Sequence, residues 1–200
     1  MQIRFPFGIV TARNPDLWRD YMTEQNPVFQ SGQTVIHPLH GKVIVRERVT
    51  EEIAGQRVVG YRIYYPNQNV AGFIPMKNNV GIRAVGTAQT LTRVVKTLQK
   101  KARARTRHWN VHAASYEARI KTGSLVEIAK VIRDLHQEPR DHEIGGLYLY
   151  DQAMGRLLEE SALIWDCSEK AALQRLIEES GLELHHPDYT KTPVSEPESS

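Results

Sequence analysis

The sequence has little cysteine and no long apolar run. Cys167 is the one cysteine among the 200 residues, which excludes an internal disulfide and is typical of a reducing compartment. No stretch approaches the roughly 20 apolar residues of a membrane-spanning helix, and residues 1–29 lack the pattern of a signal peptide. With 40% hydrophobic and 24% charged residues, the composition is that of an ordinary globular chain. We therefore expect a cytoplasmic protein with no membrane partner.

A second absence concerns negative charge, because residues 53–116 contain no aspartate or glutamate. Every charged side chain in this span is lysine or arginine, whereas acidic residues outnumber basic ones from residue 137 onward. The formal net charge of +3 hides this asymmetry. A solvated charged face normally mixes both signs, so a long acid-free span favours a surface that meets a polyanion such as nucleic acid.

No group of residues has the spacing of a catalytic or metal site. His37 and His40 have no cysteine or carboxylate cluster beside them, so we interpret them as turn and packing residues and expect no metal. Gly145 and Gly146 are too sparse for a phosphate-binding loop and are interpreted as a helix-entry turn. The sequence contains no recognisable nucleophile–base pair, catalytic carboxylate pair or nucleotide loop, so we expect neither catalysis nor a cofactor.

Residues 30–86 have the pattern of a small β domain. Short runs rich in β-branched and aromatic residues are separated by turn residues such as Ala54-Gly55 and Pro66-Asn67. The expected strands are residues 35–36, 42–49, 58–65, 70–74 and 81–85. Five short strands in so small a span predict a strongly bent sheet or barrel, which is marginal without helical packing or a partner.

From Gly86 onward the hydrophobic period becomes that of helices. Leu91, Val94, Val95 and Leu98 predict a helix over residues 90–101. Further helices are expected at residues 111–121, from Ser124 to Leu135, at 147–165 and from the cap at Asp166 to a stop at Gly181. Capping-box spacing is present at 124–127 and at 166–169. Residues 137–146 are expected to form a loop.

The whole pattern predicts an α+β protein in which a small Tudor-like β-barrel or bent-sheet domain precedes an all-α helical bundle. The expected parts are an N-terminal extension (1–29), the β domain (30–86), the helical domain (87–182) and a disordered acidic tail (183–200). Met22 begins a segment typical of a protein start, so one interpretation of residues 1–21 is an upstream extension.

The stretch from Lys100 to Leu135 carries the most functional information. Three alternating arginines precede Trp109, and a helix with an apolar stripe follows. Positive charge beside a flat apolar ring on a rigid support suits a surface that binds a phosphate backbone and pushes the ring against bases. The alternatives are a core tryptophan and a solvated basic linker. Candidate DNA-binding residues are Trp109, Arg103, Arg105, Arg107, His108, Lys100, Lys101 and His112.

Three stretches carry a resemblance to a known family. They are FQSGQTVIHPLHG (29–41), IPMKNNVGIRAVG (74–86) and HWN, followed by GSLVEIAKVIRDL (123–135), in which Gly123 stands fourteen residues after Trp109. The chain resembles the CarD/CdnL family of bacterial transcription regulators from about residue 29 to residue 180. The helical stretch, which ends in Val-Ile-Arg-Asp-Leu, is the most specific of the three.

The resemblance implies a monomer that acts on RNA polymerase at promoters. Its Tudor-like domain would pair a strand edge with the β1 lobe of the polymerase β subunit. The implied polymerase-binding residues are Glu51, Val70, Ala71, Gly72, Phe73 and Ile74. Its helical domain would touch promoter DNA at the upstream edge of the melted bubble, with Trp109 in the minor groove. A wedge that fits only distorted DNA shifts the population toward the open complex.

The chain departs from the family pattern at three places. Val111 to Ala113 stand where the family commonly has two arginines and a tyrosine, so phosphate binding would fall to the arginines before Trp109. Phe73 and Glu51 stand where the family often has arginine. Edge pairing could survive these changes, because ladder hydrogen bonds do not depend on side-chain identity. An alternative is a nucleic-acid-binding module without stable polymerase contact, and a third is an enzyme.

Overall fold

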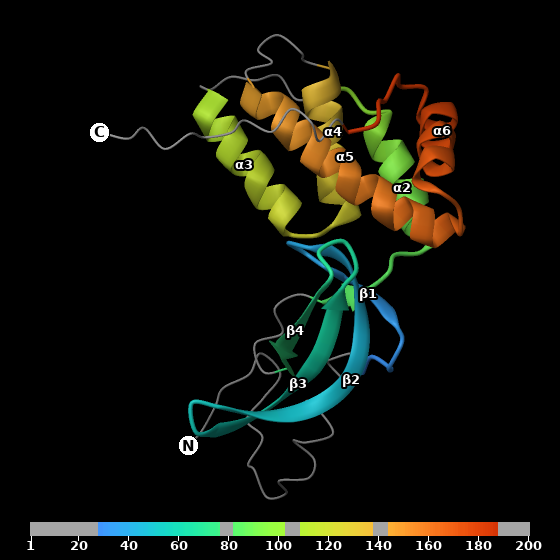
Figure 1. The fold of residues 1–200 in the computed structure, drawn as a ribbon. Coiled ribbons are helices and arrows are strands. Elements are labelled where there is room, and N and C mark those ends of the chain that lie inside the picture. The colour runs from blue at the N-terminus through green and yellow to red at the C-terminus, as the bar shows by residue number, and fades with distance from the viewer. Residues whose placement is uncertain (1–27, 77–81, 103–108, 138–143, 188–200) are drawn as a thin grey trace, which may run out of the picture.

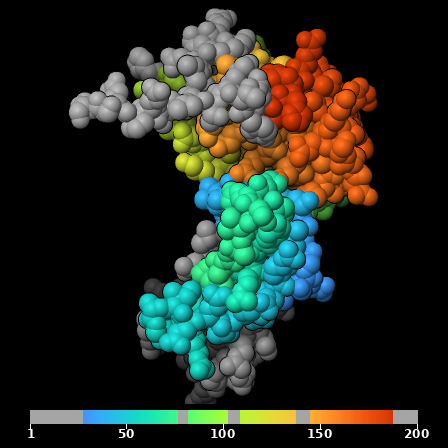
Figure 2. Space-filling view, in the orientation of Figure 1, coloured from blue at the N-terminus to red at the C-terminus, as the bar shows by residue number. Residues whose placement is uncertain are grey.

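The computed structural model describes residues 28–76, 82–102, 109–137 and 144–187, which form a sheet and a group of helices (Figure 1). The chain completes its strands before it enters the helices, which confirms the expected α+β arrangement. In the space-filling view, the two parts are separate lobes that meet over a limited contact (Figure 2). No helix in these described ranges has the length and apolar character needed to cross a membrane.

The sheet is antiparallel and has the strand order β4-β3-β2-β1-β5. Its strands are β1 (Thr34–His37), β2 (Gly41–Ile53), β3 (Gln56–Tyr65), β4 (Val70–Pro75) and β5 (Arg83–Ala84). One face of the sheet encloses a small core that includes Val35, Val43, Val45, Tyr61 and Ile63. A bulge between Val45 and Glu47 interrupts the β2–β3 register and adds to the curvature of the long hairpin. Strands β4 and β5 are the two edges of the described sheet.

All five expected strands are present, with different lengths. Strand β2 continues to Ile53 instead of ending at Val49, because the Ala54-Gly55 turn lets β2 and β3 pair to the tip. Both turn residues have positive φ, 50° and 75°, as a two-residue hairpin turn requires. Phe29, one residue before the expected start of the β domain, is buried with its ring 5.8 Å from that of Tyr61. The core of the sheet therefore includes the chain before β1.

The described helices are α2 (Ala88–Leu98), α3 (Trp109–Lys121), α4 (Leu125–Gln137), α5 (Ile144–Trp165) and α6 (Glu169–Ser180). The long α5 lies among the others and supplies Met154, Leu157 and Leu158 to their common core. Leu91 and Leu98 of α2 are buried there, as their spacing predicts. After α6 the chain adds the buried Leu184 to the same core, so packing extends past the expected start of the tail at residue 183.

Several predicted helix ends were wrong. Helix α3 already includes Trp109, and α5 begins at Ile144, so Gly145 and Gly146 lie in its first turn and not in an entry turn. The N-cap of α6 is Ser168, whose hydroxyl accepts from the Ala171 N–H, and not Asp166. Ser168 takes this place because Asp166 has a positive φ of 51° and lies in the preceding turn.

The predicted capping box of α4 was also wrong in its polar contacts. The Ser124 N–H donates to the Thr122 hydroxyl, and Glu127 pairs with Lys130 one helical turn ahead. The glutamate therefore supports the helix through a side-chain pair rather than by closing a cap.

Candidate nucleic-acid and protein interfaces

Trp109 is the first residue of α3. Its side chain is partly buried and packs against the helical core. The indole ring is tilted against Tyr116, with 6.4 Å between ring centroids. Its Nε1 lies 3.6 Å from the point that a Cβ on Gly145 would occupy. The ring is thus supported by α3 and α5 without being enclosed by them.

A row of apolar side chains packs α3 against the rest of the bundle. Trp109, Ala113, Tyr116 and Ile120 are spaced by four, three and four residues, which places them along one side of the helix. The other described side chains of α3 are exposed or partly buried. This narrow contact fixes the helix axis and holds Trp109 at the end of the row.

His112 lies one turn after the start of α3, beside Tyr116, with 6.1 Å between their ring centroids. Its Nε2 is buried and has no hydrogen-bond partner among the residues that the structure describes. Because Nε2 is buried and the ring lies beside Tyr116, we interpret His112 as a packing residue that supports Tyr116.

Lys100 and Lys101 follow α2 and are exposed. The Gln137 side chain at the end of α4 accepts from the Ala102 N–H at 2.8 Å and donates to the Lys100 carbonyl at 3.1 Å. This pair of bonds holds the backbone that carries the two lysines. The remaining candidate DNA contacts, Arg103, Arg105, Arg107 and His108, lie outside the described residues.

Strand β4 contains all of the expected polymerase-binding residues except Glu51. It pairs with β3 along its length, from Gly60 opposite Pro75 to Tyr65 opposite Val70. Its other side has no partner strand in the described part of the chain. Val70 is 50% exposed and Ala71 is exposed, whereas Ile74 faces the core. A free edge of this kind can accept an added strand from another protein.

Glu51 does not lie on the β4 edge, because β3 stands between β2 and β4. It accepts from Arg62 of β3 at 3.0 Å, and Glu47 accepts from the same guanidinium at 2.6 Å. The hydrogen bond that Arg62 donates to Glu51 and the negative charge of Glu47 raise the pKa of Arg62. Arg62 is the register partner of Phe73, so a guanidinium lies next to the edge strand. Sequence reasoning missed Arg62, since the contact depends on the register across three strands.

The ring of Phe73 covers Gly60 on the neighbouring strand. A Cβ on Gly60 would lie 2.4 Å from the ring, so a larger residue there would displace it. Phe73 and Arg62 therefore place an aromatic ring and a guanidinium side by side on one face of the sheet, next to its free edge.

The Arg133-Asp134 pair of the sequence motif is buried within the bundle rather than exposed for binding. The Arg133 Nε donates to Asp134 at 2.8 Å, and Arg119 of α3 lies 3.7 Å from the second carboxylate oxygen. Asp134 is 3% exposed. These contacts join α3 to α4 and set the direction of the helix that carries Trp109.

The histidines of the first hairpin turn form a turn structure, as expected. The Nδ1 of His37 accepts from the N–H groups of Leu39 and His40, at 3.1 and 3.2 Å. Burial, with smaller contributions from His40 and Arg156, lowers the pKa of His37 to about 4. The described residues contain no group of three or more His, Cys, Asp or Glu side chains placed to hold a metal.

Comparison with known proteins identifies the helical lobe. Residues 93–177, from α2 into α6, match the family model "CarD, C-terminal domain". The candidate transcription factor YdeB of Bacillus subtilis (strain 168) is 25% identical over 147 residues, which covers 72% of this chain and 96% of YdeB. Together with the sheet lobe ahead of that domain, the two matches support a CarD/CdnL-like family and a role in transcription regulation for this chain.

Proposed function

We propose that this transcription regulator binds the RNA polymerase β subunit through the free edge of β4 and stabilises the open promoter complex through its helical lobe. The β1 lobe of the polymerase would add a strand to β4, and backbone hydrogen bonds would supply most of that contact. Arg62 and Phe73, beside the edge, would supply its specificity. The protein would act as a monomer at the nucleoid, without a cofactor.

The wedge in this proposal is Trp109. The observation that carries it is the support of the indole by Tyr116 and Gly145 at the end of the row that fixes α3. An indole held in this way can enter a widened minor groove at the edge of the bubble without rearrangement. Lys100 and Lys101, with the arginines at 103, 105 and 107, would bind the phosphates on either side.

The direction of the effect follows from population shift. A side chain that enters only distorted DNA binds the open complex more tightly than the closed one. A preference of about 1.4 kcal/mol changes the ratio of open to closed complexes tenfold. His112 would support Tyr116 instead of contacting DNA through Nε2, because that nitrogen is buried.

The test is the lifetime of open complexes formed with the cognate polymerase, after addition of a competitor that traps free polymerase. Trp109→Ala should shorten this lifetime about tenfold, while affinity for the β subunit stays the same. Trp165→Ala is the matched control, because Trp165 is also a partly buried tryptophan and lies at the far end of α5, under Arg175. Equal lifetimes for wild type and Trp109→Ala would remove the wedge.

The second candidate is a nucleic-acid-binding module without stable polymerase contact. The observation in its favour is the engagement of Arg62 by Glu47 and Glu51, which reduces the positive charge beside β4. Capture of the polymerase β subunit on immobilised protein separates the two functions. No capture, together with retained DNA binding, would select the second.

A further inference from the structure

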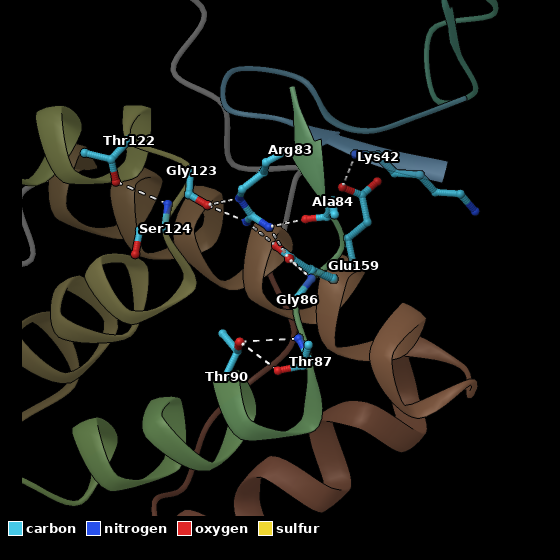
Figure 3. Close-up of polar contacts among 11 residues, drawn as sticks. Lys42, Arg83, Ala84, Gly86, Thr87, Thr90, Thr122, Gly123, Ser124 and Glu159 are labelled. Atoms are coloured by element: carbon cyan, nitrogen blue, oxygen red, sulfur yellow. Dashed lines mark hydrogen bonds and ion pairs between the residues drawn. The ribbon is translucent and has the colours of Figure 1, made fainter. Parts of the chain in front are cut away.

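An ion pair between a half-buried arginine and a buried carboxylate crosses from the sheet lobe to the helical lobe (Figure 3). Arg83 of β5 donates from Nη1 and Nη2 to the two carboxylate oxygens of Glu160 on α5, each at 2.6 Å. Its Nε also donates to the Gly123 carbonyl, at 3.2 Å, in the turn between α3 and α4. One guanidinium therefore joins the sheet edge, the central helix and the end of the helix that carries Trp109.

The environment of Glu160 makes this pair sensitive to the relative orientation of the two lobes. Glu160 is 2% exposed, and its Oε1 also accepts from the Gly86 N–H at 2.9 Å. A carboxylate buried this far is costly unless it stays paired and hydrogen-bonded. Rotation of one lobe against the other would separate Arg83 and Gly86 from Glu160, so a single relative orientation satisfies the buried charge.

The neighbouring residue of α5 makes a second contact with the sheet. Glu159 accepts from the Lys42 N–H at the start of β2 and from the Asn67 side chain in the β3–β4 turn, both at 2.9 Å. Pro38, in the β1–β2 turn, lies against Gly123, where a Cβ would be 3.0 Å from the Pro38 Cα. These contacts between the lobes are largely polar. Interfaces of this kind usually permit relative domain motion unless something specific fixes them.

We propose that Arg83 and Glu160 are positioning residues that hold the β4 edge and the Trp109 end of α3 in one fixed geometry. The inference rests on the proposed function for the identity of those two surfaces. Neither residue belongs to either surface, so each surface keeps its own contacts when the pair is removed. What is lost is simultaneous engagement, because a tethered wedge with free orientation has a lower effective concentration at the DNA than a fixed one.

The test begins with the free protein and does not depend on polymerase. Residual dipolar couplings of backbone N–H groups should fit one alignment tensor for both lobes of the wild type. In the double variant Arg83→Met, Glu160→Met, each lobe should keep its internal couplings, and the two lobes should need different tensors. Replacing both residues removes the pair without leaving a buried charge unpaired. A double variant that still fits one tensor would overturn the inference.

The functional arm measures three quantities on the same variant. Open-complex lifetime should fall at least tenfold, while affinity for the isolated β subunit and for promoter DNA should each stay within twofold of wild type. The matched control replaces the exposed pair Glu117 and Lys121 of α3 with methionine and should change none of the three. An unchanged lifetime in the Arg83–Glu160 double variant would also overturn the inference.

Two further variants keep the test decisive. If the double variant folds poorly, Glu160→Gln has nearly the same shape and should still weaken the coupling of the lobes. Arg83→Lys keeps the charge but not the two parallel hydrogen bonds of the guanidinium, so its open-complex lifetime should lie between those of the wild type and the double variant. The pattern also separates this inference from the proposed function. If Trp109→Ala leaves the lifetime unchanged, the wedge fails; if Trp109→Ala shortens it and the pair variant does not, positioning fails.

Discussion

The indole of Trp109 lies against the first turn of α5, where Gly145 leaves 3.6 Å between Nε1 and the place of a Cβ. That spacing is an ordinary van der Waals contact for a methyl group and too small for a branched side chain. Gly145 therefore sets how closely the start of α3 approaches α5, and through it where the ring projects.

Substitutions at Gly145 should show that the indole of Trp109 tolerates a methyl group at this position but not a larger side chain. Gly145→Ala should leave the ring in place and raise the free energy of unfolding by a few tenths to about 1 kcal/mol, because alanine favours a helix. Gly145→Leu should push the ring away. Fluorescence of Trp109 in a Trp18→Phe, Trp165→Phe background reports its environment. Equal spectra for the two variants would contradict the contact.

Removal of the buried carboxylate in α4 should destabilise the helical lobe. Asp134→Ala would leave Arg133 buried without its partner, and Arg119 would lose the carboxylate with which it pairs across α3 and α4. The expected loss is about 3–5 kcal/mol in the free energy of unfolding. Urea denaturation followed by circular dichroism measures it. Glu117→Ala removes a carboxylate from an exposed pair and should cost less than about 1 kcal/mol, so similar losses would refute the role of burial.

The hairpin turn at His37 should weaken in acid. The fold lowers the pKa of His37 from 6.5 to about 4, with burial as the main cause, and His40, Tyr65 and Arg156 surround the ring. Its contribution to stability is thus full above pH 6.5 and is lost as the pH falls toward 4. Protonated Nδ1 cannot accept from the Leu39 N–H, so the expected loss is on the order of 1–3 kcal/mol.

His37→Asn is the control for that titration. The asparagine oxygen can accept the N–H two residues ahead, as in an Asx turn, and it does not titrate. The difference in unfolding free energy between wild type and this variant should therefore decrease from pH 7 to pH 4. A constant difference across this range would show that His37 does not contribute to the acid dependence.

The sequence predicts the order of elements better than their ends. Alternation finds the strands and the i, i+3, i+4 spacing finds α2, because both patterns are local. The start of α3 was missed, since basic residues before Trp109 give no apolar periodicity. Gly145 was expected in a loop because glycine is typical of turns, and its contact with the indole of a helix distant in the sequence gives no local signal.

The polar contacts of the candidate sites could not be predicted, because they join residues far apart in the chain. Arg62 meets Glu47 only after the β2–β3 register and its bulge are known. Arg83 and Glu160 are separated by the whole of α2, α3 and α4. The edge position of β4 likewise depends on the return of β5 to β1 across the sheet.

Proline substitution can distinguish the two sides of the β4 backbone. Neighbouring residues in a strand point their N–H groups in opposite directions, so one of Ala71 and Gly72 donates toward β3 and the other toward the free edge. Proline at the residue whose N–H donates toward β3 should lower the melting temperature. Proline at the residue whose N–H points to the free edge should leave the melting temperature nearly unchanged and abolish capture of the polymerase β subunit. If neither proline affects capture in a folded variant, β4 is not the docking edge.

The arginines before Trp109 should determine the salt dependence of DNA binding. Each phosphate contact that is lost reduces the slope of log K against log salt by about 0.9. The triple variant replaces Arg103, Arg105 and Arg107 with glutamine, and its slope should fall by up to about 3. A matched triple variant on the exposed β2–β3 hairpin replaces Arg46, Arg48 and Arg57. This control removes the same positive charge from the other lobe, where we expect no phosphate contact, so its slope should equal that of the wild type. If the slope depended only on the overall charge of the protein, both triple variants would lower it equally.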